Sequence, residues 1–182
     1  MKSSFVILGL FIFAIVAAPL ISGAEQAEKK RPTADEQTEA GFKLMKTELL
    51  GKLGFEMKGS EVVKNYGKAP KQGAVENWEG AGLYVQQWDY PELGLELQMA
   101  AEKKDGVQTV YMIKATERCK LSTTHGIKIG STEKEVAKAY GTLRGDESEA
   151  GKTFIAGSTV GGVIFSFKDG KVAEIFIGAA SE

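Results

Sequence analysis

One combination of helix, strand and turn signals occurs twice along this chain, and it constrains the fold more than any other feature. Each copy has a Glu-Val pair and a Tyr-Gly pair, followed by an apolar stretch and an Asp-Gly pair. These pairs begin at Glu61, Tyr66 and Asp105 in the first copy, and at Glu135, Tyr140 and Asp169 in the second. Glycine commonly ends a helix, and Asp-Gly favours the tight turn of a β-hairpin. Each copy therefore predicts a short helix followed by antiparallel strands.

The two copies are expected to share one sheet, because a three-stranded sheet with a single short helix cannot cover both of its faces. We predict an α+β fold in which two tandem helix-plus-antiparallel-strand repeats form one antiparallel sheet with helices on one face. The strand signals cover residues 83–90, 93–100, 107–114, 152–157, 162–168 and 171–177. In the second of these stretches, leucines at 93, 95 and 97 alternate with polar side chains, which predicts one buried and one polar face.

A longer amphipathic helix is predicted ahead of the first copy, at residues 34–50. Thr33 and Glu36 have the spacing of a capping box, and Thr132 and Glu135 repeat that spacing before the helix of the second copy. The polar residues 68–82 are expected to form a loop. The predicted organisation is a signal peptide, a flexible leader, a first repeat with the N-terminal helix and a second repeat, at residues 1–24, 25–32, 33–118 and 119–182.

The first 24 residues have the pattern of a secretory signal peptide. Lys2 is followed by the apolar residues 5–21 and then by Ser22-Gly23-Ala24, so cleavage is predicted after Ala24. The apolar stretch is also near the lower length limit for a membrane span, so an uncleaved anchor stays open as an alternative. We predict a periplasmic or secreted protein that has no membrane association after cleavage.

The charge balance argues against two classes of partner. The chain has 23 basic and 24 acidic side chains. A near-neutral protein lacks the basic surface that binds nucleic acid or anionic lipid. The predicted partner is another exported or envelope protein, and nucleic acid is not expected.

Few residues offer catalytic or metal chemistry. Cys119 is the only cysteine and His125 the only histidine, so no zinc site and no intrachain disulfide can form. Cys119 is either a buried apolar residue or the link of a disulfide-bonded dimer. A Cys119–His125 nucleophile and base would make a cysteine-dependent enzyme, but no orienting carboxylate is apparent beside them in the sequence. We predict no catalytic residues, no metal and no cofactor, and keep the enzyme as a third hypothesis.

Four aromatic residues are the candidate partner-binding site: Trp78, Tyr84, Trp88 and Tyr90. The last three share one side of a predicted strand, and exposed aromatic side chains dominate protein interfaces. Their exposure depends on the turn that follows. A two-residue turn places them on the leucine face, in the core, whereas a three-residue loop places them on the open face.

The second copy also resembles a known fold. Gly130-Ser131-Thr132, Glu135-Val136 and Tyr140-Gly141, followed by a terminal hairpin, resemble the tandem repeat of β-lactamase-inhibitor-like proteins and of small outer-membrane assembly lipoproteins. The resemblance covers about residues 55–178 and implies a non-catalytic protein that acts by protein–protein contact. The chain departs from both groups, because it lacks the lipidated cysteine of the lipoproteins and the disulfides of the inhibitors. Lactamase inhibition is therefore not carried over.

Taken together, the sequence predicts an exported, non-enzymatic protein that binds another protein. The alternative is a periplasmic module that binds a small ligand or a cell-wall component in the groove between the two repeats.

Overall fold

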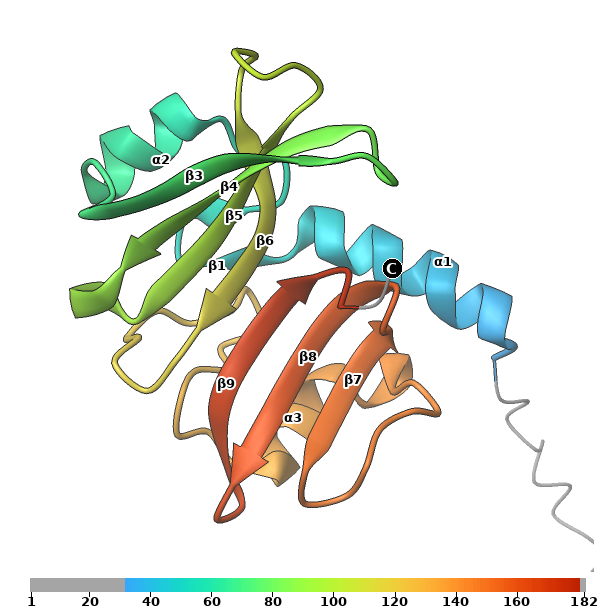
Figure 1. The fold of residues 1–182 in the computed structure, drawn as a ribbon. Helices are drawn as coiled ribbons and strands as arrows, with labels where there is room; N and C mark the ends of the chain where they lie inside the picture. Colours follow the sequence, from blue (N-terminus) through green and yellow to red (C-terminus); the bar gives the residue numbers. More distant parts are fainter. Residues whose placement is uncertain (1–31, 181–182) are drawn as a thin grey trace, which may run out of the picture. The chain divides into compact units, whose positions relative to one another are not determined.

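The computed structural model describes residues 32–180, which form an α+β fold with one large antiparallel sheet (Figure 1). This confirms the predicted fold class. The predicted signal peptide and residues 25–31 of the predicted leader lie outside the described residues. Within the described part, the chain has three α-helices and seven strands in the large sheet.

The large sheet has the strand order β3-β4-β5-β6-β9-β8-β7, and every neighbouring pair is antiparallel. Its strands are β3 (Lys71–Trp78), β4 (Leu83–Tyr90), β5 (Leu95–Ala101), β6 (Thr109–Ala115), β7 (Thr153–Ser158), β8 (Gly161–Lys168) and β9 (Lys171–Gly178). A separate two-stranded sheet pairs β1 (Leu49–Leu50) with β2 (Leu53–Gly54). The pairing of β6 with β9 joins strands from the two predicted copies.

The helices are α1 (Ala34–Thr47), α2 (Gly59–Tyr66) and α3 (Glu133–Tyr140), with short 3₁₀ turns η1 (Pro91–Leu93) and η2 (Gly141–Leu143). α1 and α3 begin where the predicted capping signals place them. Both predicted capping boxes are present, at the starts of α1 and α3. α1 ends three residues earlier than predicted, because Glu48 is extended and the next two residues form β1.

The prediction of a loop at residues 68–82 was wrong, since β3 occupies most of it. β3 is an edge strand whose side chains are mostly exposed, so it has no alternation of apolar and polar residues to reveal it. Its register against β4 shifts between Gln72 and Val75. A bulge and polar side chains are common on edge strands, where they discourage pairing with other chains.

The two Asp-Gly pairs form different turns. Asp169 and Gly170 both have positive φ and make a two-residue turn, with Lys168 opposite Lys171, as predicted. The β5–β6 hairpin is present, but its connection spans residues 102–108, and the Gly106 amide bonds to the Lys103 carbonyl at 2.9 Å. The second Asp-Gly pair is therefore the better match to the tight hairpin geometry.

All three helices contribute to one buried apolar cluster with the sheet. Val62 of α2 is fully buried, and Tyr140 of α3 packs on Phe165 of β8 with ring centroids 5.0 Å apart. Leu44 and Met45 of α1 belong to the same cluster. Burial of each such side chain contributes about 1.5–3 kcal/mol to stability.

α1 precedes the first copy in sequence but packs against β7 and β8 of the second (Figure 1). Three glycines allow this close approach. A Cβ atom on Gly41 would lie 3.0 Å from the Cα atom of Gly157 and closer still to the carbonyl oxygen of Gly161. The helix and the sheet therefore meet backbone to backbone at this point.

We expect Gly41→Ala to destabilise the protein by about 1–3 kcal/mol, because the new methyl group collides with backbone atoms. Alanine has a higher helix propensity than glycine, by about 1 kcal/mol, so a loss of stability can be assigned to packing rather than to helix propensity. Chemical denaturation gives the free energy of unfolding. The matched control is Gly141→Ala, because Gly141 has helical dihedrals and nothing within 4 Å of its added Cβ. An equal effect of the two substitutions would contradict the packing account.

Candidate functional site

The register between β4 and β5 decides where the predicted aromatic site lies. Tyr90 is opposite Leu95 and Trp88 is opposite Leu97, across a four-residue connection at residues 91–94. Because the number of connecting residues is even, Trp88 and Tyr90 lie on the leucine side of the sheet, as they would with a two-residue turn. Trp88 and Tyr90 therefore lie in the core, with exposed fractions of 7% and 3%.

These two aromatic side chains have structural partners. The indole Nε1–H of Trp88 donates to Gln86 at 2.9 Å, and the hydroxyl of Tyr90 donates to the Gly67 carbonyl at 2.9 Å. Burial raises the pKa of Tyr90. Each polar group is satisfied inside the protein, so neither side chain offers a surface to a partner.

The structure does not bring the four predicted residues together. Tyr84 and Trp78 are both half-buried. Tyr84 shares the side of Trp88 on β4, whereas Trp78 pairs with Leu83 and so lies on the other side of the sheet. There Trp78 and Tyr111, a residue that the sequence patterns did not single out, form a T-shaped aromatic pair with ring centroids 6.4 Å apart.

The side of the sheet that carries Trp78 is called the open face below. Its central row consists of Asp89, Glu96, Lys114 and Phe176, which are neighbours on β4, β5, β6 and β9. Every member of this row is half-buried, while the residues that follow or precede them along the strands lie in the core. Half-buried residues of the open face outside this row include Gln87, Gln98, Met112, Ile164 and Glu174.

The centre of the open face is a charge cluster. Lys114 forms an ion pair with Glu96, with Nζ and Oε2 2.5 Å apart. The hydrogen bond to Glu96, together with the charges of Glu174 and Asp89, holds the pKa of Lys114 above its ordinary value. Asp89 also accepts a hydrogen bond from Gln87 at 2.8 Å. Lys114 therefore pairs with Glu96 and interacts at longer range with Asp89 and Glu174, while Lys71 lies opposite Asp89 on β3.

Two hollows border this row. One, of about 590 Å³, is lined by Asp89 and Glu96 and flanked by Lys71 and Arg118. The other, of about 250 Å³, lies over β3 to β5 and is lined by Trp78, Gln87 and Gln98 among others. Both hollows are open to solvent, so the surface is indented rather than flat.

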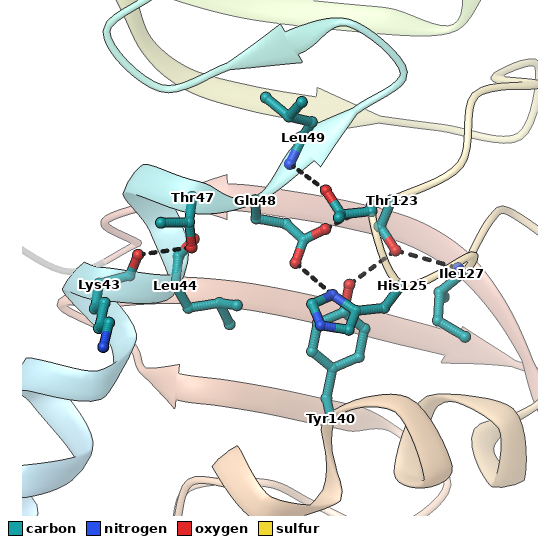
Figure 2. Close-up of polar contacts among 10 residues, drawn as sticks. Lys43, Leu44, Thr47, Glu48, Leu49, Thr123, His125, Ile127 and Tyr140 are labelled. Atoms are coloured by element: carbon teal, nitrogen blue, oxygen red, sulfur yellow. Dashed lines mark hydrogen bonds and ion pairs between the residues drawn. The ribbon is translucent and has the colours of Figure 1, made fainter.

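A second polar cluster lies between the end of α1 and residues 123–125 (Figure 2). The carboxylate of Glu48, whose side chain is 0% exposed, accepts the Thr124 amide at 2.7 Å and contacts Nδ1 of His125 at 2.9 Å. The side chain of His125 is 46% exposed, and its ring centroid lies 4.7 Å from that of Tyr140. The Tyr140 hydroxyl donates to Thr123 at 2.8 Å.

This cluster ties the end of α1 to the segment between the copies. The amide of Leu49 donates to the Thr124 hydroxyl at 3.0 Å, and the Thr124 amide also lies 3.0 Å from the Leu49 carbonyl oxygen. Sequence reasoning missed Glu48, because 77 residues separate it from His125. A charged residue directly before two leucines was the available signal.

The cluster does not assemble the cysteine and histidine of the enzyme hypothesis. His125 pairs with Glu48 rather than with Cys119. Cys119 is 3% exposed, and burial raises the pKa of its thiol, which disfavours the reactive thiolate. Within residues 32–180, no three His, Cys, Asp or Glu side chains gather as metal ligands. No helix in this same part of the chain is long and apolar enough to cross a membrane.

No protein-family model, curated protein or solved structure matches this chain. Its function is therefore inferred from the geometry described above.

We expect Glu48 and His125 to be strongly coupled in a double-mutant cycle. Glu48→Ala removes the carboxylate that bonds the Thr124 amide and His125, and each single substitution should cost about 1–3 kcal/mol of unfolding free energy. The double variant should cost less than the sum by at least about 1 kcal/mol. The control cycle uses Lys46 and Glu56, an exposed pair at 3.9 Å, whose coupling should stay below about 1 kcal/mol. Additive losses at Glu48 and His125 would show that their contact is unimportant.

We expect an alkaline loss of stability that depends on Tyr140. Burial holds the pKa of Tyr140 well above the ordinary value of about 10, so its stabilising contribution is complete below that pH and falls as pH rises. Tyr140→Phe should cost about 1 kcal/mol at pH 7, because the bond to Thr123 is lost, yet flatten the alkaline decline. Denaturant unfolding at pH 7 and at higher pH measures both effects. An unchanged alkaline slope in the variant would exclude Tyr140 as its source.

Proposed function

We propose that this chain is an exported, non-enzymatic protein that binds another protein through the open face of its sheet. The observation that carries the proposal is the half-buried row at Asp89, Glu96, Lys114 and Phe176, which crosses four strands and both copies. A sheet face that mixes charged, amide and large apolar side chains without being buried has the composition of a non-obligate interface.

We further propose that the chain consists of two related halves, with the helices on the face opposite to the open face. Gly59 of α2 lies near Trp88, and Tyr140 of α3 lies against Phe165. Leu44 of α1 belongs to the same apolar cluster. These strand residues alternate with those of the open face, which supports an arrangement with one covered and one uncovered side.

Aromatic residues supply the anchors of this proposed interface. Trp78 and Tyr111 lie edge to face on the open face, and Phe176 ends the central row. Half-buried aromatic side chains give large contact area at low entropic cost. Of the aromatic residues predicted from sequence, Trp78 is the one retained in this interface, and a role for Tyr84 stays a separate prediction.

Export is proposed from the N-terminal sequence pattern, and the partner is proposed to be another exported or envelope protein. The resemblance of the repeat to β-lactamase-inhibitor-like and outer-membrane assembly proteins supports a role in protein contact. The buried Cys119 argues against a disulfide-linked dimer, since its sulfur has little access to a second chain.

A small-ligand module is the second candidate. A groove of about 530 Å³ is lined by Phe55, Leu83, Val110 and Tyr111 among others, and its size suits a small molecule. The residues that line it belong to the first copy and its preceding loop, so it is not the groove between the repeats that the sequence suggested. A protein of this kind would give no specific protein adducts in the experiment below.

Site-specific photo-cross-linking in the native cells tests the proposed interface. A photoreactive amino acid at Gln98, on the open face, should give a discrete adduct with one protein. The same group at the exposed Lys64 of α2 is the matched control and should not give that adduct. The same adduct from both positions, or none from Gln98, would overturn binding through the open face.

A further inference from the structure

The hollow of about 250 Å³ on the open face combines an aromatic side chain with amide groups. Trp78 and Val85 supply apolar lining. Gln87 and Gln98 line the same hollow and lie opposite each other on β4 and β5. Val85 is 4% exposed, whereas the other three side chains are half-buried and reach solvent. An apolar lining with a few placed polar groups is the composition of a small-molecule site.

The bulge of β3 shapes one side of this hollow. Gly73 and Ala74 both line it, and the register shifts across them, between Gln72 and Val75. The side chain of Gln86 donates to the Gly73 carbonyl at 2.9 Å, which holds the bulge in place. Bulges commonly lie beside binding sites, because they redirect the backbone and the side chains next to them. The hollow is therefore built into the strands themselves.

The two glutamines leave both an acceptor and a donor for a ligand. Gln87 donates from Nε2 to Asp89 at 2.8 Å, and since a carboxylate oxygen only accepts, the side-chain oxygen of Gln87 remains an acceptor. In the part of the chain that the structure describes, no hydrogen bond involves the side-chain amide of Gln98, so its NH₂ group remains a donor. An acetamido group matches this pair, because it has one N–H donor and one carbonyl acceptor.

Trp78 supplies a stacking surface for a sugar ring. One face of a pyranose ring consists largely of C–H groups, which pack against the negative face of an indole ring. Trp78 is steadied by Tyr111, whose ring lies at 86° to the indole with the centroids 6.4 Å apart. Tyr111 lines the separate groove of about 530 Å³, whereas Trp78 lines the smaller hollow. Each of the two rings therefore belongs to a different site.

The larger hollow on the open face gives room for more than one sugar ring. The hollow of about 590 Å³ shares Gln87 with the smaller one, so the two are continuous along β4. Charges on this part of the open face are balanced, because Lys71 lies opposite Asp89 and Lys114 pairs with Glu96. Hydroxyl groups both donate and accept, so a neutral ligand rich in hydroxyls suits such a surface better than a ligand of one charge.

We propose that the open face binds a neutral oligosaccharide that contains an N-acetylated hexosamine. One ring stacks on Trp78 with its acetamido group between Gln87 and Gln98, and the next ring lies in the larger hollow. This inference goes beyond the proposed function, because a saccharide is a different class of ligand. Lys114 and Phe176 of the central row lie outside the lining of both hollows, so part of the row stays open to a partner protein.

The probe is chitotriose, a linear trimer of N-acetylglucosamine, titrated into the ¹⁵N-labelled full chain and followed by NMR. It should shift the indole N–H signal of Trp78 and the side-chain amide signals of Gln87 and Gln98. Cellotriose is the matched control ligand, because it has the same linkage with hydroxyl groups in place of the acetamido groups. It should bind about 5–10-fold more weakly, since it lacks the hydrogen bonds to the glutamines.

Two variants test the named side chains. Trp78→Ala should weaken chitotriose binding about 10-fold, because the stacking surface is lost. Gln98→Leu keeps a side chain of similar size and should remove the preference for chitotriose over cellotriose, and it tests the site even where Trp78→Ala fails to fold. The matched control is Tyr84→Ala, which removes a half-buried aromatic ring from the other side of β4 and should leave binding unchanged.

Three results would overturn the inference: no shifts with chitotriose, shifts confined to the groove beside Tyr111, and equal binding of cellotriose. Wild-type affinity of both Trp78→Ala and Gln98→Leu would overturn it as well. The titration contains no partner protein, so its outcome is separable from the test of the proposed function. Chitotriose binding without a Gln98 adduct in cells would reject protein binding alone, and a discrete adduct without chitotriose binding would reject the saccharide site alone.

Discussion

The register between β4 and β5 decides which of their side chains lie in the core and which lie on the open face. A shift of one residue in the pairing would move every side chain of the shifted strand to the opposite side of the sheet. The four-residue connection that sets this register includes Gly94, which has a φ of 61°. A Cβ atom there would lie 2.5 Å from the amide nitrogen of Cys119, so the turn is held against the segment that follows β6. Packing in the core and the composition of the open face are consequences of the same turn.

The second determinant is the way in which α1 is shared between the copies. The helix precedes the first copy, packs on β7 and β8, and ends at Glu48, whose carboxylate is bonded to the segment between the copies. A buried carboxylate requires partners that remain in place, because an unpaired buried charge is costly. The Glu48 cluster and the glycine contact at Gly41 therefore fix α1 to residues 123–125 and to β7 and β8, in addition to the strand pairing of β6 with β9.

Local signals in the sequence predicted the features that depend on neighbouring residues. Thr33 and Thr132 mark helix starts, and Asp169-Gly170 marks the last hairpin, because caps and tight turns are formed within a few residues. β3 was missed because an exposed edge strand needs no apolar alternation. The Glu48–His125 pair depends on a contact over 77 residues, and the burial of Trp88 depends on the length of a turn. Trp88 and Tyr90, two of the four predicted aromatic residues, therefore lie in the core. The central row of the open face could be recognised only from the strand register.

The strand order has a consequence for the time at which the protein can fold. β9 is the last strand along the chain, yet it lies inside the sheet, between β6 and β8. Until residues 171–178 are available, β6 and β8 each have an unpaired edge, and the two groups of strands cannot join. The sheet can be completed only after residues 171–178 have been synthesised. Loss of β9 from inside the sheet is therefore expected to be far more damaging than loss of β3 at its outer edge.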